Sequence, residues 1–345
     1  MHMADALISP AVGLAGWATA AGFMVHAALQ LKRDAKSSQP ALMGVLGAFV
    51  FAAQMVNFSI PGTGASGHLG GGLLLSALLG PHAAFLVMAS VLTVQALLFA
   101  DGGLLALGCN IVNLGVFTCF LAYPLLFRPV AGTEPSGRRL TLAALVSAVA
   151  GLVLGAFAVV LETTASGISQ LPFLPFLAFM VPIHLAIGAV EGLVTGSVLL
   201  YVWRARPDLV RREPDATRPL RALLIGFAVT TAGVGGMLSW FASPHPDGLE
   251  WSMGQIAGHE QVRASDDGLH GTLGRLQKAT SLLPDYSIAG VQGEATEPAW
   301  PAPDAGTSLS ATIGAALTLL LALGTGLLLR LARGRAKSSG QAPIP

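Results

Sequence analysis

The stretch LTLAALVSAVAGLVLGAFAVVLE, residues 140–162, decides the class of fold, because its single charged residue is the last one, Glu162. A membrane-spanning helix needs about 20 predominantly apolar residues, and this run supplies them. The whole chain has the same character: 53% of its 345 residues are hydrophobic, 11% are charged, and the mean hydropathy is +0.67. Soluble globular proteins carry about 25% charged residues. The sequence therefore predicts an integral membrane protein.

Eight stretches are long and apolar enough to cross a membrane, at roughly 11–31, 40–57, 82–100, 104–127, 140–162, 172–203, 220–242 and 309–332. A ninth, HLGGGLLLSALLG at 68–80, is short and crosses only if it is tilted or packed inside the bundle. We predict an all-α polytopic membrane protein with a bundle of about seven segments, followed by two further transmembrane helices.

Basic residues give the expected orientation, since cytoplasmic loops are enriched in Lys and Arg. Of the 19 Lys and Arg residues, 16 follow the stretches 11–31, 104–127, 172–203 and 309–332. With nine crossings they all lie on one side. We expect a multi-pass protein of the cell inner (plasma) membrane, with its N-terminus outside and its C-terminus in the cytoplasm. No basic patch is interleaved with aromatic residues, so nothing points to a nucleic-acid partner.

The chain divides at a basic connector, residues 204–221, into a first domain, 1–203, and a two-helix domain, 222–335. The second domain contains the one long polar interruption, 243–307, with nine acidic residues and the histidines His245, His259 and His270. By the orientation above this loop is extracytoplasmic. The spacing of these histidines matches no metal-ligand motif. The loop could therefore pack over the outer face of the protein, or it could gather metal ions.

The opening residues, MHMADALISP at 1–10, suggest metal chemistry. The α-amine of Met1, the amide nitrogen of His2 and Nδ1 of His2 can close two chelate rings around a divalent ion. These nitrogens fill three corners of a square plane, and an imidazole would suit the fourth. Such a set suits Ni(II) or Cu(II). The ordinary alternative is a solvated histidine at a frayed terminus.

A second histidine lies on the same expected side, in the glycine-rich loop NFSIPGTGASGHLGGG at 57–72. Its glycines allow the backbone to fold closely around a ligand, which would bring His68 to the metal. A flexible external turn is the alternative. The two features together are more specific than either one.

Four stretches resemble the CbiM/NikM family, the substrate-specificity components of energy-coupling factor transporters for cobalt and nickel: MHMADALISP, GTGASGHLGG, VQALLFADGGLLALGCNIVN at 94–113 and VPIHLAIGAVEGLVTG at 181–196. The likeness covers about residues 1–203. Beyond the connector, SPHPDGLEWS at 243–252 and PDYSIAG at 284–290 resemble the small companion subunit of the nickel systems, which has two helices flanking a PDGLE loop.

The resemblance implies a natural fusion of two subunits that captures Ni(II), or Co(II), from outside. It implies Met1, His2 and His68 as metal ligands, with the N-terminus inserted into the protein. It also implies a membrane coupling subunit and ATPase subunits as partners. His82 stands where the family would have Trp, and adds a polar group of unknown use.

Other polar residues of the apolar segments are candidates with weaker support. Gln95, Asn110 and Asn113 could hydrogen-bond across helices and support the site from behind its ligands. His184 and Glu191 are seven residues apart, hence on one helix face. They could pair, stabilise the bundle or lie on a metal path.

The sequence contains no G-x-x-x-x-G-K-[S/T] phosphate loop, so ATP hydrolysis would belong to separate subunits and the chain is not predicted to be an enzyme. One alternative is a secondary transporter driven by an ion gradient, with His184 and Glu191 as its relay. A membrane-embedded hydrolase that uses the same pair is the other, although no nucleophile elbow or HExxH motif is present.

Overall fold

The computed structural model describes residues 2–34, 39–211, 220–258, 265, 267–288 and 301–339. The described chain is helical except for short connections and one hairpin, in which β1 (Phe58–Ile60) pairs antiparallel with β2 (Ala65–Gly67). Six helical stretches are long and apolar enough to span a membrane. They are α1 (Pro10–Asp34), α4 (Pro81–Leu98), the run of α5 (Leu107–Ile111), η2 (Val112–Phe127) and α6 (Arg128–Ala131), α7 (Gly137–Ser166), α8 (Phe173–Ala205) and α13 (Ala305–Ser339). The predicted all-α polytopic membrane fold is confirmed.

Three further apolar helices are shorter. The helices α2 (Gln39–Gln54) and α10 (Arg221–Gly236) have 16 residues each, and α3 (Gly72–Leu79) has eight. At about 1.5 Å per residue, α2 and α10 extend about 24 Å and α3 about 12 Å. The 68–80 stretch is therefore helical only from Gly72, and His68 lies in the non-helical chain that precedes it.

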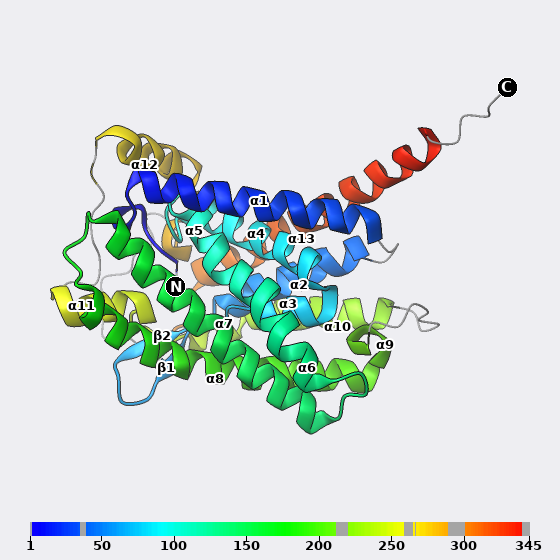
Figure 1. Cartoon of the computed structure of the whole chain (residues 1–345). Coiled ribbons are helices and arrows are strands. Elements are labelled where there is room, and N and C mark those ends of the chain that lie inside the picture. Colours follow the sequence, from blue (N-terminus) through cyan, green and yellow to red (C-terminus); the bar gives the residue numbers. More distant parts are fainter. Residues whose placement is uncertain are drawn as a thin grey trace.

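The shorter elements gather at the two ends of the bundle (Figure 1). The segment before α1, the β1–β2 hairpin, α11 (Gly248–Ala257) and α12 (Gly268–Thr280) lie at one end, and α9 (Pro207–Arg211) and the last turns of α13 lie at the other. Three short helical turns complete the described chain: η1 (Asp5–Leu7), η3 (Leu238–Phe241) and η4 (Pro284–Tyr286).

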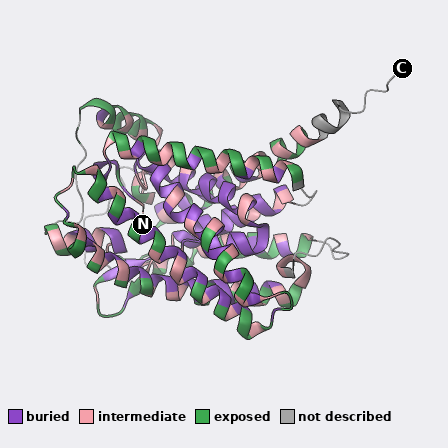
Figure 2. Ribbon diagram, in the orientation of Figure 1, coloured by how far each residue is buried: buried purple, intermediate pink, exposed green. Residues whose placement is uncertain are grey.

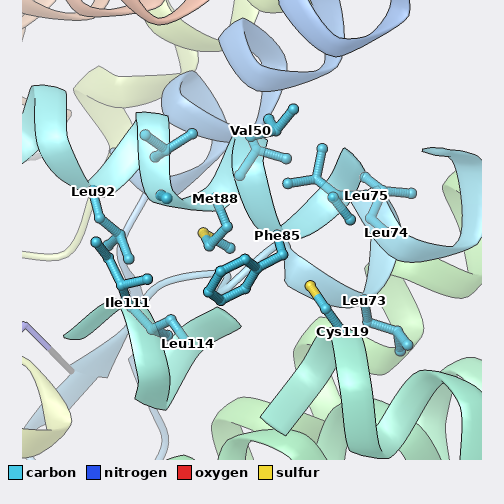
Figure 3. Packing of buried hydrophobic residues seen from close by; sticks show 14 of the residues in the cluster. Val50, Leu73, Leu74, Leu75, Phe85, Met88, Leu92, Ile111, Leu114 and Cys119 are labelled. Carbon is cyan, nitrogen blue, oxygen red and sulfur yellow. The ribbon is translucent and has the colours of Figure 1, made fainter. Parts of the chain in front are cut away.

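The middle of the bundle is buried while the outward faces of α1, α7 and α8 are exposed (Figure 2). Every residue of α3 is buried. Figure 3 shows Leu73, Leu74 and Leu75 of α3 packed near Phe85 of α4 and Cys119 of η2. This enclosure lets so short an apolar helix persist, since its stability comes from tertiary packing.

Glycines of α8 make a close seam with α7. A Cβ atom at Gly188 would lie 2.7 Å from Cα of Val149, and one at Gly192 would lie 2.5 Å from Cα of Leu145. Small residues permit such approach of two helices in a membrane. The seam fixes α8, whose buried face carries His184 and Glu191 toward the end of the bundle that holds the N-terminus.

Candidate metal-binding site

A cavity of about 500 Å³ opens at the end of the bundle where the N-terminus lies. Four separated parts of the chain line it: the N-terminal segment, the loop before α3, the turn between α4 and α5, and the loop of the two-helix domain. Its titratable lining residues are His2, His68, Asp101, His245, Asp247, Glu250, Asp285 and Tyr286.

A carboxylate orients the imidazole of His2. Nδ1 of His2 donates to Oδ1 of Asp101 at 2.7 Å, and Oδ2 of Asp101 accepts the Tyr286 hydroxyl at 2.5 Å. Burial alone would raise the pKa of Asp101, but the charge of His2 and the hydrogen bonds from His2 and Tyr286 lower it to about 2. Asp101 is therefore an ionised acceptor between the N-terminus and the two-helix domain.

The other nitrogen of the His2 ring has no such partner. The side chain is only 7% exposed, and Nε2 is buried without a hydrogen bond to the described residues. The His2 and His68 ring centroids lie 5.0 Å apart, with the ring planes tilted by 30°. Buried polar atoms normally have partners, so an orphaned imidazole nitrogen on a cavity wall is a feature of a binding site.

The N-terminal segment is anchored inside the protein. Oδ1 of Asn110 accepts the backbone N–H of Met3 at 2.9 Å, and Nδ2 of Asn110 donates to the Met3 carbonyl at 3.2 Å. Gly103 N–H donates to the same carbonyl at 2.9 Å, and Oδ1 of Asp5 accepts the N–H of Ala106 at 2.9 Å. A frayed terminus makes no such set of bonds, so the geometry of residues 2–5 favours the metal interpretation of His2.

The loop that carries His68 follows the β1–β2 hairpin. Gly62 and Gly64 adopt positive φ in its turn, a conformation that glycine allows without strain. Nδ1 of His68 donates to the Leu69 carbonyl at 3.1 Å, and burial lowers the pKa of the imidazole. The neutral ring then has its lone pair on Nε2, which is the state a metal ligand requires.

The two-helix domain attaches to this hairpin through its PDGLE segment. Ser66 N–H donates to the Pro246 carbonyl at 2.7 Å, and the Ser66 hydroxyl donates to the His245 carbonyl at 2.8 Å. Asp247 then caps α11, accepting the N–H of Glu250, which completes a capping box. These contacts agree with the expectation that the 243–307 loop packs over this end of the bundle.

Two predicted supporting residues, Gln95 and Asn113, do not line the cavity. Gln95 donates to Oε1 of Gln54 at 2.8 Å behind the cavity. Asn113 donates to Oε2 of Glu162 at 2.7 Å and contacts Sδ of Met3 at 3.8 Å. Both therefore lie behind the cavity wall rather than in it.

Two further histidines of the described residues, His82 and His270, do not line the cavity. His82 lies at the start of α4, with its ring 5.4 Å from that of His26. His270 bonds the Ile8 carbonyl at 2.8 Å. His259 lies outside the described residues, as does the predicted ligand Met1.

His184 and Glu191 do not bond each other. Nδ1 of His184 donates to the Met180 carbonyl of its own helix at 2.8 Å. Glu191 instead accepts the N–H groups of Gly70 and Gly71, at 2.7 and 3.1 Å. The possible pairing of these two side chains is wrong, because the carboxylate is directed at a loop and the imidazole at its own helix.

Among the described residues, no three His, Cys, Asp or Glu side chains lie together as a metal cluster. The predicted donor set depends instead on the α-amine and an amide nitrogen, which are not side-chain groups. The sequence interpretation gave no role to Asp101 or to Tyr286, which the structure joins to His2. An ionisable residue beside two glycines in a turn was the available signal for Asp101.

Comparison with known proteins places the chain among metal transporters. Residues 2–209 match the CbiM model, described as the cobalt uptake substrate-specific transmembrane region, and residues 221–331 match the PDGLE domain. The fused nickel transport protein NikMN of Rhodobacter capsulatus is 31% identical, covering 92% of this chain and 94% of that protein. The putative fused nickel transport protein NikMN of Archaeoglobus fulgidus is 30% identical, over 81% and 83%. A crystal structure of a truncated transition metal transporter superposes with a TM-score of 0.53 at 27% identity, covering 59% of this chain and 99% of that one.

Proposed function

This chain belongs to the CbiM family of nickel and cobalt transport proteins, fused to a PDGLE domain, and on that premise we propose that it captures Ni(II) as the substrate-specificity component of an energy-coupling factor transporter. Co(II) is the alternative substrate. The metal enters from outside, at the end of the bundle that carries the cavity. The basic ends of the helices face the cytoplasm, and the domains divide at the 204–221 connector.

One observation carries the proposal: His2 and His68, 66 positions apart in sequence, meet on the cavity wall with ring centroids 5.0 Å apart. We propose that the Met1 amine, the His2 amide nitrogen, the His2 imidazole and the His68 imidazole hold the metal. Four nitrogens in a plane favour Ni(II). Cu(II) prefers the same donors, so its exclusion would rest on the shape of the cavity or on availability.

Chelation by the terminus has a specific requirement in this protein. Only Nδ1 of His2 can close a ring with its own amide nitrogen, and Nδ1 donates to Asp101 in the metal-free structure. Metal binding at Nδ1 would leave the ring proton on Nε2 and would release the amide proton of His2 to solvent, and Asp101 would give up its bond to Nδ1. The Tyr286 hydroxyl remains as a partner for the carboxylate.

Transport would need partners. The sequence has no phosphate loop, so a coupling membrane subunit and separate ATPase subunits would supply the energy. A gradient-driven secondary transporter would instead need a proton or sodium path through the chain. His184 and Glu191, the residues considered for that path, each bond to backbone groups and not to each other.

The experiment compares nickel binding by two purified full-length forms, one with the Met1 amine free and one with three residues, Gly-Ser-Gly, added in front, because a single added residue would put the histidine in third position and itself complete a four-nitrogen site. Both are titrated with Ni(II) and followed by visible absorption for the band of a planar four-nitrogen complex. We expect the band and the binding to disappear in the extended form while its thermal unfolding is unchanged. Equal binding by both forms would show that the terminal chelate is wrong.

A further inference from the structure

Glu191 is a buried carboxylate whose bonding partners lie in the loop that carries His68. It is 1% exposed in the middle of α8, and its two oxygens accept the N–H groups of Gly70 and Gly71 at 2.7 and 3.1 Å. A charge inside a membrane-spanning segment is costly unless it is paired or hydrogen-bonded, and such residues are usually functional. Glu191 is thus positioned to fix a loop across the bundle.

Gly70 is also held from its other side. Nε2 of Gln54, on α2, donates to the Gly70 carbonyl at 2.8 Å, and Gln95 of α4 orients Gln54 through a further bond of 2.8 Å. Both polar groups of the Gly70 residue are therefore bound by buried side chains. A Cβ atom at Gly70 would lie 3.0 Å from Oε2 of Glu191, so a larger residue there would crowd the carboxylate.

The same face of α8 confines the loop on the other side of His68. A Cβ atom at Gly67 would lie 2.5 Å from Cγ1 of Ile187, which is one helical turn before Glu191. The backbone of His68 thus lies between two fixed points, Gly67 against Ile187 and Gly70 against Glu191. Its imidazole extends from this restrained backbone to the cavity wall, beside His2.

We propose that Glu191 is a positioning residue for metal capture: it holds the Gly70–Gly71 backbone so that the His68 imidazole reaches the fourth coordination position. The inference rests on the proposed function and adds a residue that supports a metal ligand without binding the metal itself. It also distinguishes positioning from proton relay, because a relay would move protons to or from Glu191 during transport and leave metal binding unchanged.

The test uses the full chain with Glu191→Gln. Glutamine keeps the size of the side chain but has one acceptor oxygen, and its amide nitrogen cannot accept the second backbone N–H. Thr195→Val is the matched control, since Thr195 is also buried on α8, one turn further along, and its change removes a hydroxyl with little change of shape. Both variants are compared with the wild type for thermal unfolding.

Two measurements are made. Hydrogen–deuterium exchange of the metal-free protein reports the amides of Gly70 and Gly71, and titration reports the Ni(II) affinity and the visible band. In Glu191→Gln we expect faster exchange of those amides and an affinity lowered by about 10- to 100-fold, the usual effect of losing a supporting group. The band should move to longer wavelength, because water replaces the His68 nitrogen. Thr195→Val should change none of these.

The outcomes are separable. Unchanged exchange and unchanged affinity in Glu191→Gln would overturn the positioning role. If the wild type itself binds no nickel, the proposed function fails, whereas the exchange of the metal-free protein still decides whether Glu191 fixes the loop. Faster exchange with unchanged affinity and band would show that the loop is held for stability alone, which also overturns the inference.

Discussion

Alanine at Gly108 tests the close approach of two helices beside the cavity. Gly108 lies in α5, and a Cβ atom there would lie 2.5 Å from Cα of Trp17 and 2.6 Å from the carbonyl carbon of Gly16, both in α1. Non-bonded carbon atoms prefer about 3.5–4.0 Å. The two helices must therefore separate by about 1 Å, and because the atoms are backbone atoms no side-chain rotation relieves the contact.

The cost can be estimated from these distances. Overpacking a core typically costs about 1–3 kcal/mol, and a backbone-to-backbone contact belongs in the upper half of that range. Alanine recovers up to about 1 kcal/mol over glycine in helix propensity. We expect Gly108→Ala to lower the free energy of unfolding by about 1–2 kcal/mol. Because α5 carries Asn110, which holds the backbone of Met3, Ni(II) affinity should fall with it.

The control is Gly22→Ala. Gly22 is an exposed residue of α1, and no atom of another described segment lies within 4 Å of the position that a Cβ would take there, so the change should gain up to about 1 kcal/mol. Thermal unfolding of both variants in the same detergent and at the same scan rate checks the difference, since membrane proteins often unfold irreversibly. A melting temperature of Gly108→Ala equal to that of Gly22→Ala would refute the reasoning.

Two other substitutions address the groups around the N-terminus. Burial raises the pKa of the Asp5 carboxyl group, although backbone N–H groups such as that of Ala106 oppose the shift. The folded protein therefore binds the carboxyl proton more tightly than the unfolded chain does. As the pH rises through the raised pKa, the proton is lost and the folded state loses stability. Asp5→Asn keeps an acceptor for Ala106, so its melting temperature relative to the wild type should increase as the pH rises above about 4, the ordinary pKa of an aspartate, and a constant difference would contradict this. Tyr286→Phe removes the hydroxyl that is bonded to Asp101. We expect it to lower the free energy of unfolding by about 1.5 kcal/mol, which is the low end for a hydrogen bond to a charged group, because Asp101 is 25% exposed. An unchanged melting temperature would show that this contact does not join the two-helix domain to the site.

The membrane fold was predictable because the length of an apolar run is a local property of the sequence. The hypothesis about His2 also rested on a local property, since chelation by a terminal histidine depends on neighbouring atoms. The structure brings His68 beside His2, and the role of both as metal ligands stays a prediction. The partner of Glu191 was not: its spacing from His184 identified a shared helix face, but that face turns onto backbone N–H groups about 120 positions away. Backbone partners leave no trace in the types of side chain, so such a contact emerges only when the helices are packed.

The attachment of the two-helix domain explains why fusion to the first domain is useful. Its contacts at the cavity include backbone hydrogen bonds, such as Ser66 to Pro246 at 2.7 Å, Ser243 to Asn57 at 2.8 Å and Asp285 to Phe99 at 2.9 Å. Each is worth only about 1 kcal/mol net, whereas the association of two separate proteins costs several kcal/mol in lost freedom. A covalent connection makes the contact intramolecular and raises the effective concentration of the loop. Fusion therefore helps to keep the PDGLE segment against the hairpin that precedes His68.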